Sequence, residues 1–276
     1  MAAPNGWESS PSRPLAVVTG ASSGIGLELA RQFAEHDFDL LIAAEDDAIE
    51  DAAEELRASG GQVQAAQVDL ATNEGVDELY RRIEELGRPV DAIALNAGVG
   101  VNGEFIATDL EAQMRLIGLN VTGVVRLSHY ILRDMVARGE GRVLYTASIA
   151  ADMPGTYSAT YNASKAFDHL FAEALREELK DTGITVTSLQ PGPTDTNFFD
   201  RSGATQQNTK VATGKKDDPA DVAKDGFEAL MKGKDHVVAG SLKNKVQDTM
   251  AQVMTEPAKA KMHSKQSKPG TGKRKS

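Results

Sequence analysis

A glycine-rich segment directly follows a short apolar run near the start of the chain. The run at 15–19 has the character of a buried strand, and the segment TGASSGIG at 19–26 leads from it into a helical pattern. Glycines at 20, 24 and 26 let the backbone turn sharply and approach a ligand. The N–H groups at the start of a helix favour an anion. The segment predicts a strand, a phosphate-binding turn and a helix, with turn chemistry alone as the alternative.

Apolar runs and helical patterns alternate along the rest of the chain. This alternation predicts βαβ units and a doubly wound, Rossmann-type α/β fold, with a parallel sheet of about seven strands flanked by helices. The expected strands are 15–19, 39–43, 62–67, 92–96, 142–147, 185–190 and 236–239. The expected helices are 26–35, 49–59, 75–85, 109–137, 159–180 and 219–231. We expect a flexible leader at 1–13 and one dinucleotide-binding domain at 14–255.

The composition is that of an ordinary globular protein, but its charge is uneven. Hydrophobic residues make up 41% and charged residues 25%, and there are no cysteines. No apolar run approaches the ~18 residues of a membrane span, and the N-terminus lacks the apolar core of a signal peptide, so the expected location is cytoplasmic. Residues 257–276 hold seven lysines and arginines and no acid, so removing them from a net charge of −10 leaves −17. We expect an acidic body that repels nucleic acids and anionic membranes, and a basic, disordered tail at 256–276.

Tyr161 and Lys165 lie four residues apart in YNASK, and Ser148 precedes them just after an expected strand. The spacing places the tyrosine and lysine on one helix face. A nearby ammonium stabilises a phenolate, and lowering the tyrosine pKa from about 10 to about 7 takes roughly 4 kcal/mol. Tyr161 could then exchange a proton with an oxygen that Ser148 binds. The pair alone is weak evidence, so the order of the surrounding motifs carries the argument.

Polar and small residues follow other expected strands. Asp69 comes after the third strand, where it could accept a hydrogen bond from an adenine amino group, and Asn96-Ala97-Gly98 ends the fourth. Pro191-Gly192 follows the sixth strand. The carboxyl ends of parallel strands meet at one edge of a sheet, where ligands bind. The whole set indicates hydride transfer between a nicotinamide cofactor and a carbonyl or alcohol.

In this order the motifs resemble the short-chain dehydrogenase/reductase family in its compact single-domain form, over about residues 15–240. The resemblance implies an NAD(P)-dependent oxidoreductase acting on CH–OH and C=O groups, with Tyr161 as general acid/base. It implies a catalytic tetrad of Asn120, Ser148, Tyr161 and Lys165, in which Asn120 holds a water that links the lysine to bulk solvent. The expected cofactor contacts are Thr19, Gly20, Ser22, Ser23, Gly24, Ile25, Gly26, Glu45, Asp69, Leu70, Asn96, Ala97, Gly98, Tyr161, Lys165, Pro191, Gly192, Thr194 and Thr196.

The end of the second expected strand favours NAD over NADP. A carboxylate at Glu45 can accept both hydroxyls of an adenosine ribose and repels a 2′-phosphate. Members of the family that bind NADP usually carry a basic residue at this point or before the second glycine of the turn, where this chain has Ala44, Glu45 and Ser23. NADP stays the alternative, because Glu45 and Asp46 could simply be solvated acids in the first turn of a helix.

The resemblance places the substrate over the nicotinamide, beneath a loop at 197–216. The predicted substrate contacts are Ser148, Met153, Tyr157, Phe198 and Phe199, with Val99, Val101, Ile149 and Pro154 as further lining residues. This largely apolar set predicts a neutral ketone or secondary alcohol.

Three further expectations complete this interpretation. The resemblance implies a homodimer or homotetramer formed through the helices at 109–137 and 159–180. The five histidines are scattered without ligand spacing, so no metal site is expected. A non-catalytic, dinucleotide-binding regulatory protein is the second hypothesis, which the presence of both Tyr161 and Lys165 disfavours.

Overall fold

The computed structural model describes residues 13–241 and 254–272. Within these residues one parallel sheet has seven strands in the order β3-β2-β1-β4-β5-β6-β7. The strands are β1 Leu15–Thr19, β2 Asp39–Ala44, β3 Val63–Gln67, β4 Ala92–Leu95, β5 Gly141–Thr146, β6 Ile184–Pro191 and β7 His236–Ala239. Strand order reverses between β1 and β4, which confirms the doubly wound, Rossmann-type fold.

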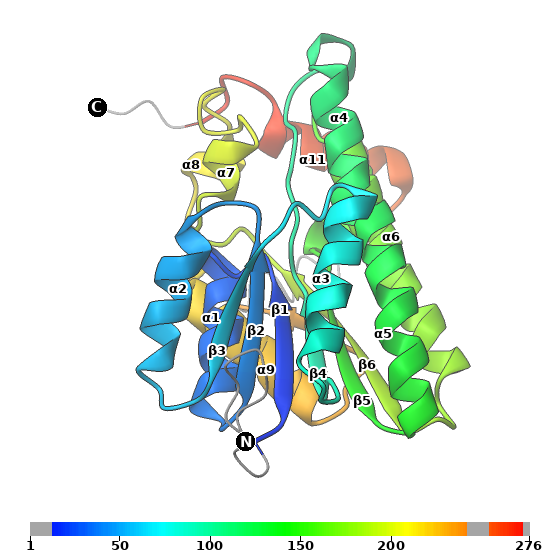
Figure 1. Ribbon diagram of the computed structural model, residues 1–276. Coiled ribbons are helices and arrows are strands. Elements are labelled where there is room, and N and C mark those ends of the chain that lie inside the picture. The colour runs from blue at the N-terminus through cyan, green and yellow to red at the C-terminus, as the bar shows by residue number, and fades with distance from the viewer. Residues whose placement is uncertain (1–12, 242–253, 273–276) are drawn as a thin grey trace.

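Helices cover both faces of the sheet, as Figure 1 shows. The longer helices are α1 Gly24–Glu35, α2 Ala48–Arg57, α3 Asn73–Glu85, α4 Leu110–Ile117, α5 Val124–Arg138, α6 Ala159–Glu178, α9 Pro219–Met231 and α11 Glu256–Ser267. Two short helices, α7 Phe198–Arg201 and α8 Lys210–Thr213, lie in the segment expected to cover the substrate. Single turns form η1 Phe105–Ala107 and η3 Ile149–Asp152.

Alternation along the strands separates two cores. In β1, Leu15 and Val17 face the core under α3, α5 and α6, whereas Ala16 and Val18 face the core under α1, α2 and α9. Successive side chains of a strand point to opposite faces, so a strand covered on both sides reads as a continuous apolar run. The expected strands therefore match the observed ones to within about a residue at most ends.

The expected helix at 109–137 is interrupted. A π-helical turn, η2 Gly118–Gly123, separates α4 from α5. A Cβ on Gly118 would lie 2.7 Å from the carbonyl oxygen of Ala71, and one on Gly123 would lie 2.3 Å from that of Leu70. The two glycines therefore let the wide turn pack against the loop after β3, a contact that the helical periodicity does not encode.

The tail differs from the disordered segment expected at 256–276. Residues 256–267 form α11, and Thr156 Oγ1 donates to the Ala260 carbonyl at 3.1 Å. The Gly270 N–H donates to Gln207 O at 2.8 Å. These polar contacts with distant loops order a segment whose composition alone is that of a solvated chain. The expected leader lies outside the described residues except for Arg13, and no helix within the described ranges has the length and apolar character of a membrane span.

Candidate active site

A cavity of about 270 Å³ opens at the carboxyl end of the sheet. All the predicted cofactor contacts line it except Thr19 and Gly26, which lie behind the turn. Ser148, Met153, Phe198 and Phe199 line it too, whereas Tyr157 and Asn120 do not. The cavity therefore gathers residues from β1 to α11 that are far apart in the sequence.

The turn after β1 has the features of a phosphate site. Gly20 and Gly24 have φ values of +67° and +58°, and a Cβ on Gly26 would lie 2.1 Å from the carbonyl oxygen of Gly20. Ser23 precedes α1 without capping it through its side chain, so the first N–H groups of α1 stay available to a ligand. Thr19 Oγ1 accepts from the N–H groups of Asn96 and Ala97 at 3.0 and 3.1 Å, which fixes the turn to the end of β4. This arrangement fits a dinucleotide pyrophosphate.

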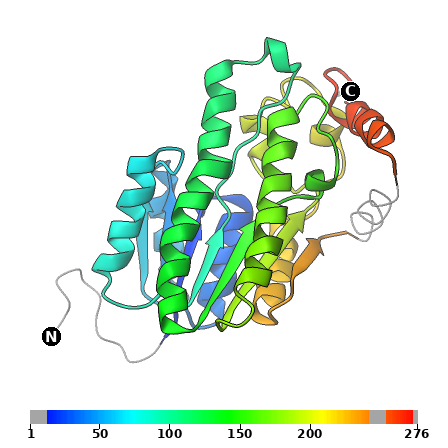
Figure 2. The ribbon, with the colours of Figure 1, turned by 90° about the vertical axis from the view of Figure 1, so that its right-hand side faces the viewer.

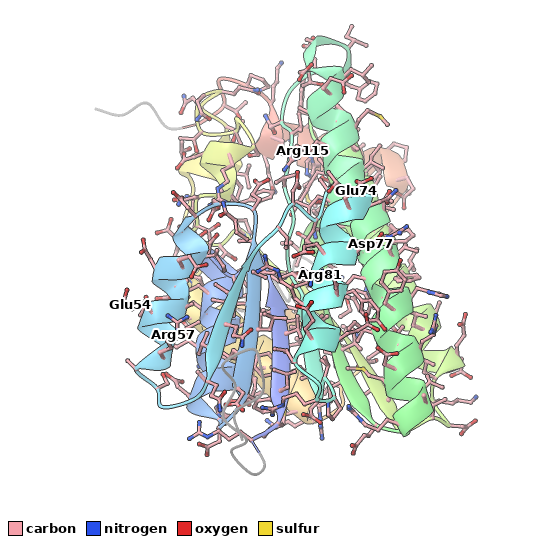
Figure 3. The ribbon with its side chains drawn as sticks, in the orientation of Figure 1. Glu54, Arg57, Glu74, Asp77, Arg81 and Arg115 are labelled. Atoms are coloured by element: carbon pink, nitrogen blue, oxygen red, sulfur yellow. The ribbon has the colours of Figure 1, made fainter. Side chains whose placement is uncertain are left out.

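An arginine connects the two carboxylates expected at the adenosine end. Arg115 on α4 donates to both oxygens of Asp69, at 2.8 and 3.0 Å, and also binds Glu45. The hydrogen bond from Arg115 holds the pKa of Asp69 below its ordinary value. Figure 3 shows Arg115 close to α4, above the ends of the strands. The sequence reasoning missed this residue, since nothing local relates it to acids 46 and 70 positions away.

Tyr161 and Ser148 meet at the cavity wall. Ser148 Oγ accepts from the Ala150 N–H at 3.1 Å and donates to Pro191 O at 3.4 Å, and the Tyr161 ring packs against Phe198 at 5.1 Å between centroids. Burial raises the pKa of Tyr161, while the Lys165 charge and a hydrogen bond with Ser148 lower it, and the net shift is upward. The sequence-based expectation of a lowered tyrosine pKa is thus wrong for the protein alone, because burial outweighs the lysine.

Lys165 is almost fully buried, at 5% exposure. Its Nζ donates to Thr146 O at 2.7 Å and to Asp168 Oδ2 at 3.0 Å. Burial alone would lower the pKa of Lys165, but the Asp168 carboxylate and Tyr161 raise it above its ordinary value. The ammonium is therefore held in its charged form.

Asn120 lies in η2, behind Gly98. Its Oδ1 accepts from the Val99 N–H, and its Nδ2 donates to Val99 O and to Ser164 Oγ, each at 3.0 Å. A Cβ on Gly98 would lie 3.4 Å from both Asn120 Oδ1 and Lys165 Nζ. The structure therefore brings Asn120 near the lysine, although its side chain does not face the cavity.

On the nicotinamide side, the end of β6 turns beside the cavity. Thr194 is buried and its Oγ1 donates to Gly192 O at 2.9 Å. Thr196 packs against the turn after β1, since a Cβ on Gly24 would lie 2.9 Å from its Cγ2. Thr196 thereby connects the nicotinamide side of the expected cofactor site to the glycine turn.

The substrate half of the cavity has an apolar and a polar side. Phe198 and Phe199 from α7 stand with Ile149 and Met153, as expected, whereas α11 contributes the polar residues His263, Gln266 and Ser267. His263 Nδ1 lies 3.0 Å from Thr156 O, and a carbonyl can only accept, so Nδ1 carries the hydrogen. Burial lowers the pKa of His263, which leaves the Nε2 of the neutral ring as an acceptor. The sequence reasoning missed these three residues, because it treated the tail as disordered.

The comparisons with known proteins assign the chain to a family. The family model for short chain dehydrogenases matches residues 14–207, more than half of the chain. The chain belongs to the short-chain dehydrogenase/reductase family. This short-chain dehydrogenase/reductase is accordingly an oxidoreductase of a family that binds nicotinamide dinucleotides.

Three known proteins illustrate the similarity. The chain is 38% identical over 186 residues to 1-deoxy-11-beta-hydroxypentalenate dehydrogenase of Streptomyces exfoliatus. The matched region covers 66% of this chain and 67% of that protein. The chain is 35% identical over 192 residues to "Probable oxidoreductase EphD" of Mycobacterium tuberculosis, covering 68% of this chain but only 32%, about a third, of that relative's length. A solved short-chain dehydrogenase from Sphingobium yanoikuyae in complex with NADPH has a TM-score of 0.75 at 29% identity, over 82% of this chain and 87% of that chain.

Proposed function

We propose that this enzyme transfers hydride between NAD(H) and a neutral ketone or secondary alcohol, with Tyr161 as general acid/base. The observation that carries the proposal is the position of Tyr161, Ser148 and Lys165 in the wall of the cavity that begins at the glycine turn. A pure binding protein needs the turn but not a tyrosine, serine and lysine beside it. The substrate is a small molecule that enters this cavity.

Each side chain of this set has a defined task. A bound nicotinamide supplies or accepts the hydride. During reduction Tyr161 gives its proton to the carbonyl oxygen, and during oxidation its phenolate takes the hydroxyl proton. Ser148 binds the same oxygen and stabilises the charge that develops there. Lys165 stabilises the phenolate and would hold the nicotinamide ribose, and Asn120 fixes the chain behind the lysine.

Cofactor preference is proposed to depend on opposite charges at Glu45 and Arg115. Glu45 repels a 2′-phosphate, whereas Arg115 attracts one, and the two side chains pair in the protein alone. The solved relative that holds NADPH favours NADP as the second candidate. We favour NAD because Glu45 directly follows β2, where the adenosine ribose is expected, and Arg115 is already bound bidentately by Asp69.

Fluorescence titration with NADH and NADPH tests this preference. We expect NADH to bind more tightly to the natural protein. Glu45→Gln should lower the ratio of NADH affinity to NADPH affinity about tenfold. Arg115→Gln should raise this ratio by a similar factor, since each substitution removes one charge-assisted contact. Arg81→Gln is the matched control, because Arg81 lies on α3 and pairs with Glu78, away from the cavity.

The outcomes of the titration separate the candidates. Tighter binding of NADPH to the natural protein would replace NAD by NADP and leave the reaction class in place. Binding of neither nucleotide would contradict the oxidoreductase proposal and favour the regulatory hypothesis.

The substrate is proposed to be mainly apolar with a hydrogen-bonding group away from the reacting carbon. Phe198, Phe199 and Met153 fit the apolar part. The Nε2 of His263, which also lines the cavity, could accept from a hydroxyl. A ketone that carries a second, neutral hydroxyl matches both sides of the cavity.

We also propose that the enzyme forms a homo-oligomer through α4, α5 and α6. Figure 2 shows α5 and α6 side by side on one face of the molecule. Large apolar side chains are exposed there, including Leu170 at 67% and Leu110 at 63%.

Analytical ultracentrifugation should show a dimer or tetramer, and Leu170→Glu should shift the equilibrium toward the monomer. A second substitution on another helix makes the test independent of Leu170. Met114→Glu on α4, where Met114 is also exposed, should give the same shift toward the monomer. A monomeric natural protein would contradict this proposal.

A further inference from the structure

Asp168 is a buried carboxylate to which the proposed reaction gives no task. It lies on α6, three residues after Lys165, and is 3% exposed. Its Oδ2 accepts from Lys165 Nζ at 3.0 Å, and its Oδ1 has no hydrogen-bond partner among the residues described. Burying a carboxylate is costly unless it is paired, so its partner, the proposed catalytic lysine, explains its position.

Asp168 limits what Lys165 can bind. An ammonium has three N–H donors. Thr146 O takes one and Asp168 Oδ2 takes another, which leaves one donor for the cavity. Nζ lies 3.4 Å from the position of a Cβ on Gly98, which lines the cavity. The two contacts within the chain therefore fix the ammonium and direct a single donor toward the cofactor and Tyr161.

Asp168 also changes the charge that Tyr161 experiences. A lone ammonium favours the phenolate, but a carboxylate 3.0 Å from that ammonium makes the pair neutral overall. The charge of Asp168 accordingly raises the pKa of Tyr161 and that of Lys165. Burial raises the pKa of Asp168 itself above its ordinary value, although the Lys165 charge opposes this shift.

Few other titratable groups lie on the elements that pack against α6. They are Asp152 on η3, Glu111 and Arg115 on α4, and Arg142 and Tyr145 on β5, with none on β6 or η2. On α5, which lies beside α6, Arg126 and Tyr130 bind Asp77, and Asp134 binds Tyr80, so these groups pair with α3 and not with Asp168. Of these, Tyr145 is coupled to Asp168: burial and the Asp168 charge raise its pKa, while its hydrogen bond with Ser128 lowers it. Tyr145 is fully buried and points to α5, so it stays protonated and adds no charge.

We propose that Asp168 is a positioning residue of the active site that holds the Lys165 ammonium and offsets its charge, so that Tyr161 keeps its proton to higher pH. This inference rests on the proposed function. Its consequence is a Tyr161 that stays a proton donor for carbonyl reduction across neutral pH. Alcohol oxidation, which needs the phenolate, then requires alkaline conditions.

The test is the pH profile of kcat/KM for alcohol oxidation, in the natural enzyme and in Asp168→Asn. The rising limb reports loss of the Tyr161 proton, and the falling limb reports loss of the Lys165 proton. Removing the carboxylate charge should shift both limbs to lower pH, each by about one pH unit. Glu178→Gln is the matched control, since it removes an exposed carboxylate from the same helix, and its profile should coincide with that of the natural enzyme.

Two limbs that do not move in a folded, NADH-binding Asp168→Asn variant would overturn the proposal, even if the rate falls evenly at all pH values. Should this variant fail to fold, Asp168→Leu removes the same charge with a side chain suited to burial, and the same shifts are expected. If the natural protein binds cofactor and catalyses the reaction but the variants show no shift of the pH profile, only the role proposed for Asp168 is refuted. Failure of the natural protein to bind either nucleotide refutes the proposed function.

Discussion

Replacing Tyr161 with phenylalanine is expected to lower turnover by about a thousandfold while cofactor binding persists, since proton transfer by a positioned side chain contributes on the order of 10²–10⁴. The substitution removes one oxygen and keeps the ring that packs against Phe198. Ser148 would still bind the substrate oxygen, so KM should change little and the loss should appear in kcat. Steady-state kinetics on a ketone panel, together with NADH titration of the variant, measures both quantities.

Tyr157→Phe is the matched control for this experiment. Tyr157 lies four residues before Tyr161, yet it does not line the cavity, and its carbonyl accepts from the Gly103 N–H at 2.8 Å. Its hydroxyl should therefore be dispensable. Equal losses in the two variants, or a Tyr161→Phe enzyme with ordinary turnover, would contradict the role assigned to Tyr161.

The sheet and the strand-end residues were predictable because local patterns encode them. Continuous apolar runs such as 15–19 and 39–43 mark strands covered on both faces. Once a parallel sheet is inferred, residues after its strands must meet at one edge. Asp69, Asn96 and Pro191 were placed in this way, and all three line the cavity.

Interactions between distant segments were not predictable from such patterns. Arg115 meets Glu45 and Asp69 only because η2 packs against the loop after β3, and a helical wheel cannot reveal that contact. Asp168 did leave a local signal, an acid at i+3 from the lysine on a helix that faces the sheet. Its effect on Tyr161 depends on the burial of Lys165 and Asp168, which the sequence does not give.

The helix α11 at 256–267, in the segment expected to be disordered, was not predicted for a related reason. Its lysines and small residues indicate a solvated chain, and α11 has no strongly apolar face that would betray a packing surface. What orders it is polar: Asn102 Nδ2 donates to Ser267 O at 3.4 Å, and Thr156 contacts both Ala260 and His263. The composition of a segment indicates how much apolar surface it can bury. It does not indicate which of the segment's backbone groups will form hydrogen bonds with distant loops.

A chain that ends at residue 253 should bind its substrate far more weakly while binding NADH normally. Without α11 the cavity loses His263, Gln266 and Ser267 and opens to water on the substrate side. Loss of one well-packed wall, worth about 1.5–3 kcal/mol in buried contact, raises KM roughly tenfold to a hundredfold. The glycine turn and Glu45 lie at the other end of the cavity, so nucleotide affinity should stay within about twofold. Steady-state kinetics and NADH titration of the two chains provide the comparison.

A chain that ends at residue 272 is the matched control, because it loses Lys273, Arg274 and Lys275 but keeps α11. If KM rises only in the shorter chain, the effect belongs to residues 254–272, which include α11, and not to the three basic residues at 273–275. His263→Phe then tests the polar side alone: it should weaken a ketone that bears a second hydroxyl and spare its deoxy analogue, because only the former needs an acceptor at Nε2. An unchanged KM in the chain ending at 253 would mean that α11 takes no part in substrate binding, and a change in sedimentation instead would assign it to assembly.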